Sequence, residues 1–336
     1  MRHKVAQWGD ISEHYQRGAI VVGNGASIAV SPNFSYGSLL DHAKKNGLLT
    51  EDVQILFNFF DTQDFELVLR LVWQANNVNK SLEIPDDRTH EAYRHVRDCL
   101  IEAVRAVHPE HETVKAHLPL MCRFLESFGT VLSLNYDLLI YWAMTHGLNG
   151  DGRHRFKDCF LWNRRFDDDW SKYRELYKER TNTLVFYPHG SLALCRDVVE
   201  QEFKIHAAGA RLLEAILAEW QSERAVPLFV SEGTRTQKIC SIQSSYYLST
   251  VYREVLTSVA GTLTIFGWGI GEHDRHLLQR MRNAGIKRVA VSVFRNDQVY
   301  CNYAYQIIRN DLGEVHVDFF DSESPGCWIH PIRTQD

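Results

Sequence analysis

Three short polar motifs, each placed directly after a strand-like apolar run, constrain the fold of this chain more than any other feature. In chain order the runs are 19–22, 130–134 and 184–187, and the motifs that follow them are Gly23-Asn24-Gly25-Ala26-Ser27, Asn135-Tyr136-Asp137 and His189-Gly190-Ser191. The carboxyl ends of parallel strands open into one crevice, where ligands bind in open α/β sheets. The sequence therefore predicts that these motifs meet in one site at a sheet edge.

Short apolar or β-branched runs recur along the second half of the chain, with helical patterns between them. The runs are 226–230, 262–266, 288–294 and 314–320, and the helical patterns are 212–220, 246–260 and 272–283. Continuous apolar runs are typical of strands that helices cover on both faces. The alternation predicts an α/β fold with a doubly wound, mostly parallel Rossmann-like sheet.

Residues 36–125 depart from this alternation, because helical patterns fill them and no convincing strand appears. Residues 64–73 carry acids in their first turn and apolar residues at helical spacing, and residues 94–107 form a second pattern that Pro109 ends. We therefore expect a sheet-containing domain of residues 1–35 and 126–336, interrupted by a helical insertion of residues 36–125.

Composition excludes several classes of function. A formal net charge of −5 gives no reason to expect direct binding to nucleic acid. The first ten residues lack the apolar core of a signal peptide, and no run of about 18 apolar residues predicts a membrane span. The seven cysteines are scattered and never form Cys-x-x-Cys, which fits reduced thiols and excludes a thiolate zinc ribbon. We expect a cytoplasmic protein without a membrane partner.

The glycine turn after residues 19–22 permits a sharp bend and close approach of a ligand to the backbone. The helix that follows would aim free N–H groups at a phosphate. The third glycine of the dinucleotide fingerprint is missing and no lysine follows, so the turn is no nucleoside-triphosphate P-loop. Taken alone, an ordinary strand-to-helix turn explains it equally well.

Asn135 and Asp137 offer hydrogen-bond donors and acceptors to ribose hydroxyls. Both residue types are also favoured at helix N-caps, and an apolar helical pattern covers residues 138–144. Asp137 fits either role, whereas Asn135, next to the strand, is the better candidate for a function.

His189, at a strand end beside a glycine, is a candidate general base near neutral pH. His108-Pro109-Glu110-His111 looks like a metal pair, but the proline breaks its geometry, so we expect no metal there. Two later strand ends, Val230-Ser231-Glu232-Gly233 and Phe266-Gly267-Trp268-Gly269, place small or polar residues on the same edge. Turn glycines without a ligand are an equal interpretation of the second.

Taken together, these motifs resemble the landmarks of the sirtuin-like superfamily of NAD-binding proteins. Ser31-Pro32-Asn33-Phe34 is similar to part of the sirtuin cofactor loop, and the downstream runs Ser231-Glu232-Gly233-Thr234 and Gly271-Glu272-His273-Asp274 look more like its bacterial branch. The four zinc cysteines of true sirtuins are absent, and Ser35 replaces the loop arginine. Both departures argue against protein deacylation.

The resemblance implies an NAD⁺ glycohydrolase that releases nicotinamide and ADP-ribose, of the type used in anti-phage abortive infection. It assigns catalysis to Asn135, His189 and Asp137, and NAD contacts to Gly23, Gly25, Ala26, Ser27, Ser231, Gly267 and Trp268. Because no cluster of ligand residues has a credible spacing in the sequence, we expect the activity to need no metal. Two alternatives stay open: a non-catalytic regulatory module that binds NAD or ADP-ribose, and a transferase of ADP-ribose or acyl groups.

Control of such an enzyme is expected to come from outside the chain. The strands run from residue 19 to residue 320 and leave no room for a separate sensor domain. Because an unrestrained hydrolase would drain NAD⁺, we expect a homo-oligomer, or a regulatory protein partner, to complete the site.

Overall fold

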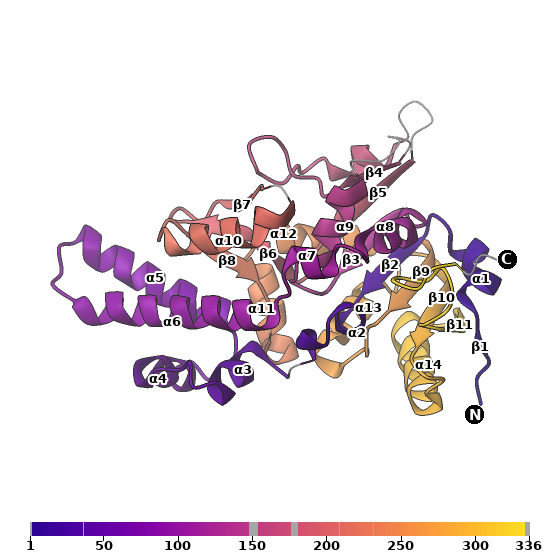
Figure 1. Ribbon diagram of the computed structural model, residues 1–336, viewed down its shortest axis with the longest axis horizontal. Coiled ribbons are helices and arrows are strands. Elements are labelled where there is room, and N and C mark those ends of the chain that lie inside the picture. The colour runs from indigo at the N-terminus through magenta and orange to yellow at the C-terminus, as the bar shows by residue number, and fades with distance from the viewer. Residues whose placement is uncertain are drawn as a thin grey trace.

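The fold is built on an eight-stranded sheet in which every neighbouring pair of strands is parallel (Figure 1). The computed structural model describes residues 2–35, 37–147, 154–175, 181–207, 209–230 and 232–332. The strand order is β1-β11-β10-β9-β2-β3-β5-β4. The strands are β1 (Val5–Ala6), β2 (Ala19–Val22), β3 (Thr130–Ser133), β4 (His154–Lys157), β5 (Thr181–Phe186), β9 (Gly261–Phe266), β10 (Ile286–Val293) and β11 (His316–Asp321).

Strand β2 lies at the centre of this sheet, between β3 and β9. All four of its residues are buried, as are the four of β3, because helices flank the sheet. The predicted α/β class and the doubly wound, mostly parallel sheet are therefore confirmed. From β2 the chain continues to β3 on one side, and β9 later pairs with the other side of β2, so the carboxyl end of β2 marks the switch point where ligand sites form.

Between β2 and β3 the described residues form helices joined by loops, and several of these helices project away from the sheet (Figure 1). After α2 (Asn24–Val30) come α3 (Leu39–Lys45), α4 (Glu51–Phe59), α5 (Phe65–Ser81), α6 (Asp87–Val107), α7 (His111–Val114) and α8 (Leu118–Glu126). Helices α3 to α6 pack on one another, whereas α8 packs beside the sheet against α9 (Leu139–Gly147). The segment between β2 and β3 thus carries helices, and the last of them packs in the layer that covers the sheet.

A second, antiparallel sheet departs from the expected arrangement. Its order is β7-β6-β8, with β6 (Gly190–Asp197), β7 (Glu202–Lys204) and β8 (Ala225–Phe229). The run 226–230 does form a strand, but β8 pairs antiparallel with β6 and lies outside the parallel sheet. A continuous apolar run reports burial on both faces, and burial alone does not set the direction of pairing.

The remaining helices close the structure around both sheets. They are α1 (Trp8–Ile11), α10 (Leu212–Gln221), α11 (Arg235–Gln243), α12 (Tyr246–Thr250), α13 (Arg275–Arg280) and α14 (Gln298–Leu312). In the part of the chain that the structure describes, no helix combines the length and apolarity that a bilayer crossing requires.

Candidate functional site

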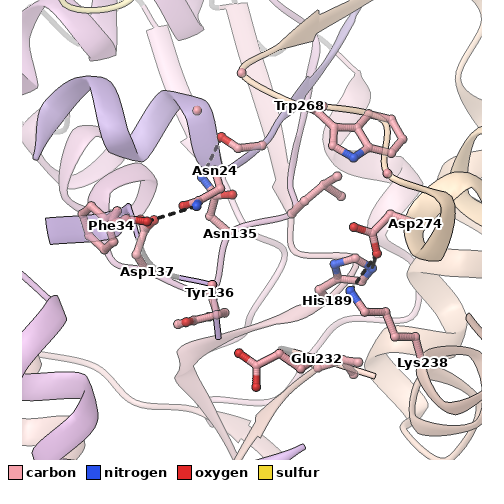
Figure 2. Close-up of a pocket in the computed structure, with 18 residues that line it drawn as sticks. Asn24, Phe34, Asn135, Tyr136, Asp137, His189, Glu232, Lys238, Trp268 and Asp274 are labelled. Atoms are coloured by element: carbon pink, nitrogen blue, oxygen red, sulfur yellow. Dashed lines mark hydrogen bonds and ion pairs between the residues drawn. The ribbon is translucent and has the colours of Figure 1, made fainter. Parts of the chain in front are cut away.

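A pocket of about 380 Å³ opens where the strand-end motifs meet (Figure 2). The predicted residues that line it are Gly23, Gly25, Asn135, Asp137, His189, Gly267 and Trp268. Ala26 and Ser27 are almost fully buried and lie beneath its wall, and Ser231 falls outside the described residues. The structure therefore brings the three motifs together from β2, β3 and the end of β5.

The glycines of the first turn allow the backbone of the loop after β2 to touch the backbone of the loop after β9. Gly25 N donates to Gly267 O at 2.7 Å, and a Cβ on Gly23 would lie 2.6 Å from the Trp268 Cα. Gly267 has φ +64°, and a Cβ there would lie 2.3 Å from Ala26 N. Because the N–H groups of Gly25 and Ala26 already donate within the protein, fewer donors remain for a phosphate than the turn predicts.

Asn135 is held by hydrogen bonds from beneath the pocket. Its Nδ2 donates to Gly23 O at 3.1 Å and to Ser27 Oγ at 2.8 Å, and Ser27 Oγ donates to Asp137 Oδ2. The other carboxylate oxygen of Asp137 accepts from Leu139 N at 2.9 Å, where α9 begins. Burial raises the pKa of Asp137 to about 6, although these two hydrogen bonds oppose the shift. Asp137 thus secures the helix start and also faces the pocket.

His108 holds the segment between β3 and α9 in place and is not arranged as one half of a metal pair. Its Nδ1 donates to Pro109 O at 3.0 Å, and its Nε2 accepts from Leu138 N at 3.0 Å. Both ring nitrogens are therefore used inside the protein. Burial lowers the pKa of His108 to about 4, which keeps the ring neutral.

His189 lies at the junction of the two sheets, between the end of β5 and the start of β6. Val230 N donates to its carbonyl at 2.7 Å, and Gly190 has φ +76°, with no room for a Cβ beside Leu228 O. His189 is 3 % exposed, and its Nε2 has no hydrogen-bond partner. Burial lowers the pKa of His189 to about 3, so the ring is neutral at pH 7, while the nearby charge of Asp274 opposes this shift.

Two charged residues beside His189 were not among the predicted site residues. Asp274 Oδ1 lies 3.7 Å from His189 Nε2 and accepts from Lys238 Nζ at 2.8 Å (Figure 2). Burial raises the pKa of Asp274, but His189 and Lys238 outweigh burial and hold it below its usual range. The sequence feature that could have identified Asp274 is the polar turn after the strand at 261–266, because this strand ends at the same edge of the sheet as the other motifs.

The chain that enters the helical insertion forms one side of the pocket. Phe34 and Gly37 line it, and Phe34 O accepts from Asn24 Nδ2 at 3.2 Å. Glu232 also lines the pocket, and its Oε1 accepts from Leu39 N at 2.7 Å, at the start of α3. The insertion is therefore tied directly to the pocket wall.

A second, more apolar pocket of about 510 Å³ adjoins the first. The two share Gly25, Gly267, Trp268 and Gly269. Its other lining side chains include Ile28, Phe294, Tyr300, Trp328 and Ile329. Together the pockets form a polar chamber and an apolar chamber, separated largely by glycine backbone.

Comparison with known proteins assigns the chain to a family. Residues 20–328 match the family described as a domain of unknown function, DUF4917. The match covers the antiparallel sheet, the helical insertion, and the parallel sheet apart from β1 and the first residue of β2. No curated protein matches the chain.

Proposed function

We propose that this chain, which belongs to the DUF4917 family, is an NAD⁺ glycohydrolase that acts in the pocket between Asn135 and His189. The observation that carries the proposal is the pair of adjoining chambers, one polar and one apolar, with glycine backbone between them. A dinucleotide has the same order of parts: a polar ribosyl-nicotinamide, a diphosphate and a flat adenine.

The two chambers suit the two ends of NAD⁺. The apolar pocket offers Trp328 and Phe294 to an adenine ring, as ligand pockets commonly offer aromatic walls. Gly269 lines both pockets and has nothing within 4 Å of its Cβ position, so a diphosphate can approach the backbone there. The polar pocket then receives the nicotinamide ribose beside Asn135 and His189.

The proposed reaction breaks the bond between C1′ of the ribose and the nicotinamide nitrogen. The bonding electrons leave with nicotinamide, and positive charge develops on the ribose as in other glycosyl transfers. A water oxygen then bonds to C1′, and its proton passes to His189 Nε2 and on to solvent. The products are nicotinamide, ADP-ribose and one proton.

The side chains around the reacting carbon have separate roles in this mechanism. The unpartnered Nε2 of His189 accepts the proton, a contribution of about 10²–10⁴-fold for general bases. The carboxylate of Asp274, 3.7 Å away, stabilises the imidazolium that forms. Asn135, fixed from below by its bonds to Gly23 and Ser27, orients the ribose hydroxyls.

The resemblance to bacterial sirtuin-like proteins supports the same activity and a role in anti-phage defence. Self-association or a protein partner that acts on the helical insertion is the form of control we propose. The bond between Glu232 and Leu39 supports this, because it links the insertion to the pocket wall.

The deciding experiment is to incubate the purified chain with NAD⁺ and to quantify nicotinamide over a wide range of protein concentration. We expect nicotinamide release, with specific activity rising as the protein self-associates. His189→Ala should remove the activity, and His14→Ala, which changes an exposed histidine, should not.

ADP-ribose binding by calorimetry separates the alternatives. Tight binding with no nicotinamide release at any concentration would favour a regulatory binding module. Nicotinamide release with ADP-ribose attached to protein would favour a transferase.

A further inference from the structure

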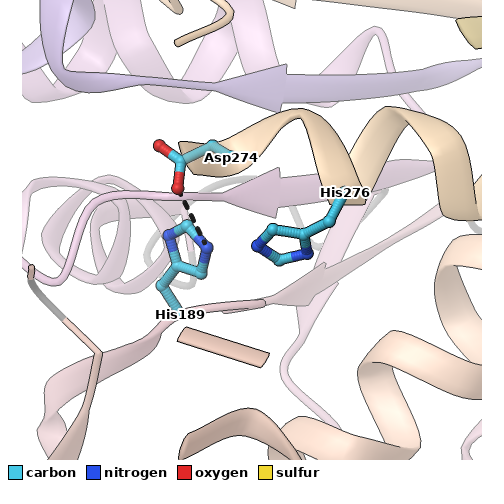
Figure 3. A group of neighbouring side chains, drawn as sticks. All are labelled: His189, Asp274 and His276. Carbon is cyan, nitrogen blue, oxygen red and sulfur yellow. Dashed lines mark ion pairs between the residues drawn. The ribbon is translucent and has the colours of Figure 1, made fainter. Parts of the chain in front are cut away.

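We propose that His189, Asp274 and His276 form a binding site for a divalent transition-metal ion of the Zn²⁺ class (Figure 3). This site goes beyond the proposed hydrolase, whose chemistry requires no metal. It lies at the inner end of the polar pocket, where the turn after β9 meets the end of β5.

The three side chains already have nearly the separation that a metal requires. Their candidate ligand atoms all lie within 4.8 Å of one another, and His189 Nε2 is 3.7 Å from Asp274 Oδ1. Bonds of about 2.0–2.1 Å in tetrahedral zinc sites place neighbouring ligand atoms roughly 3.3 Å apart. Small side-chain rotations would therefore close the site without moving the backbone.

Unsatisfied nitrogen atoms provide an independent reason to expect a ligand. His276 is 1 % exposed, and neither of its ring nitrogens has a hydrogen-bond partner. His189 Nε2, also buried, has none. Buried polar atoms are almost always hydrogen-bonded, so unpartnered nitrogens on adjacent imidazoles require an explanation. A metal ion bound by both rings would satisfy one nitrogen on each.

The donor set selects the class of ion. Two imidazoles and one carboxylate suit Zn²⁺, Co²⁺ and Ni²⁺, whereas Ca²⁺ and Mg²⁺ prefer oxygen ligands. Three protein ligands leave a fourth position open toward the pocket, which Asp274 and His189 both line.

Lys238 competes with a metal ion for the carboxylate of Asp274. Its ammonium group lies 2.8 Å from Asp274 Oδ1, so a dication must displace it or share the carboxylate with it. Lys238 therefore weakens binding, and its removal should strengthen binding. Loss of a ligand and loss of this competitor thus change metal affinity in opposite directions.

Metal binding would also switch off the proposed hydrolase. A metal on His189 Nε2 occupies the lone pair that accepts the proton from water. Bound Zn²⁺ and NAD⁺ cleavage are then mutually exclusive, and the metal is an inhibitor. This consequence rests on the proposed function, whereas the binding site itself does not.

The test is a titration of chelator-treated protein with Co²⁺, followed by visible absorbance, then displacement by Zn²⁺ and calorimetry with Zn²⁺ alone. We expect one saturable site per chain. His276→Ala should weaken Zn²⁺ binding by at least about 10-fold, a loss seen even for residues that only support a ligand. Lys238→Gln should tighten it, and His14→Ala should leave it unchanged.

Three outcomes would overturn the site: no saturable binding, unchanged affinity in a folded His276→Ala protein, or weaker binding in Lys238→Gln. Asp274→Asn provides a second ligand variant if His276→Ala does not fold. All of these measurements proceed without NAD⁺. A protein that binds Zn²⁺ but never cleaves NAD⁺ would contradict the hydrolase and leave the metal site in place.

Discussion

The crevice of the sheet and the helical insertion bury titratable groups of opposite kinds. Beneath and around the pocket lie histidines, and burial lowers the pKa of His108 and of His189. In the insertion lie Asp64 and Glu66, which are 2 % and 3 % exposed, and burial raises the pKa of each well above its ordinary range. Burial therefore favours the neutral form of all four groups, with the two histidines releasing protons and the two acids retaining them.

The two acids of the insertion also differ from the histidines in their surroundings. Asp64 caps α5, because its Oδ1 accepts from Glu66 N at 3.0 Å, while Glu66 lies 3.4 Å from Arg70 Nε. After burial itself, the nearby charge of Asp64 is the main cause that raises the pKa of Glu66. The positive charge of Arg70 lowers the pKa of both acids but does not outweigh burial.

This difference gives the two regions opposite dependence on pH. A group that binds fewer protons in the folded state makes the protein more stable as pH rises, and one that binds more does the reverse. His108 therefore adds stability as pH rises from about 4 to 6.5, and His189 as pH rises from about 3 to 6.5. The acids subtract stability as pH rises above 4.5, the ordinary value for Glu66.

The largest expected effect is a loss of activity that a substitution in the pocket causes and a substitution in the insertion does not. Asn135→Ala should lower nicotinamide release by about 100-fold, because misplacing a substrate by about 1 Å can cost that much. Asp64→Asn, in the insertion, should retain turnover close to that of the unchanged protein. Steady-state assays on both variants check this, and equal losses in the two would erase the functional distinction between the regions.

Glu66→Gln should reduce the loss of folding stability that the unchanged protein shows as pH rises. The amide cannot ionise, so the variant should gain roughly 1–3 kcal/mol over the unchanged protein between pH 5 and pH 8, since one pKa unit corresponds to about 1.4 kcal/mol. Urea unfolding at several pH values measures the gain. A difference that does not vary with pH would show that Glu66 is ionised in the folded state.

His108→Gln should produce the opposite slope. The unchanged protein gains stability as pH rises from about 4 to 6.5, because the unfolded chain binds a proton that folded His108 does not. The variant should lose roughly 1–3 kcal/mol of that gain over this interval. The same unfolding series provides the measurement, and a slope equal to that of the unchanged protein would contradict it.

The smallest expected effect concerns the cap of α5. Asp64→Ala should cost about 1 kcal/mol at pH 5 as a lost N-cap, whereas Asp64→Asn should cost only a few tenths, because asparagine caps as well as aspartate. Thermal unfolding of the pair resolves the difference. Equal costs would mean that packing at this position outweighs the cap.

Much of this architecture follows from local signals in the sequence. The acids in the first turn of residues 64–73 and their apolar spacing predicted a helix, which α5 forms from Phe65. The strand-end positions of Gly23, Asn135 and His189 predicted that they converge. The expectation that residues 226–230 belong to the parallel sheet was wrong, because an apolar run does not specify which strand it pairs with or in which direction. The contacts of Asp274 with His189 and Lys238 depend on turns far apart in the chain, and no local pattern specifies them.

The interlocked loops at Gly25 and Gly267 also bear on how the protein is made. Translation produces β2 and Asn135 early, but β9, which lies beside β2, begins only at Gly261. Until β9 is made, the side of β2 that pairs with β9 in the finished fold has no partner, and such an unpaired strand edge favours aggregation. A growing chain therefore carries His189 without a finished pocket, and the site is assembled only when synthesis is nearly complete.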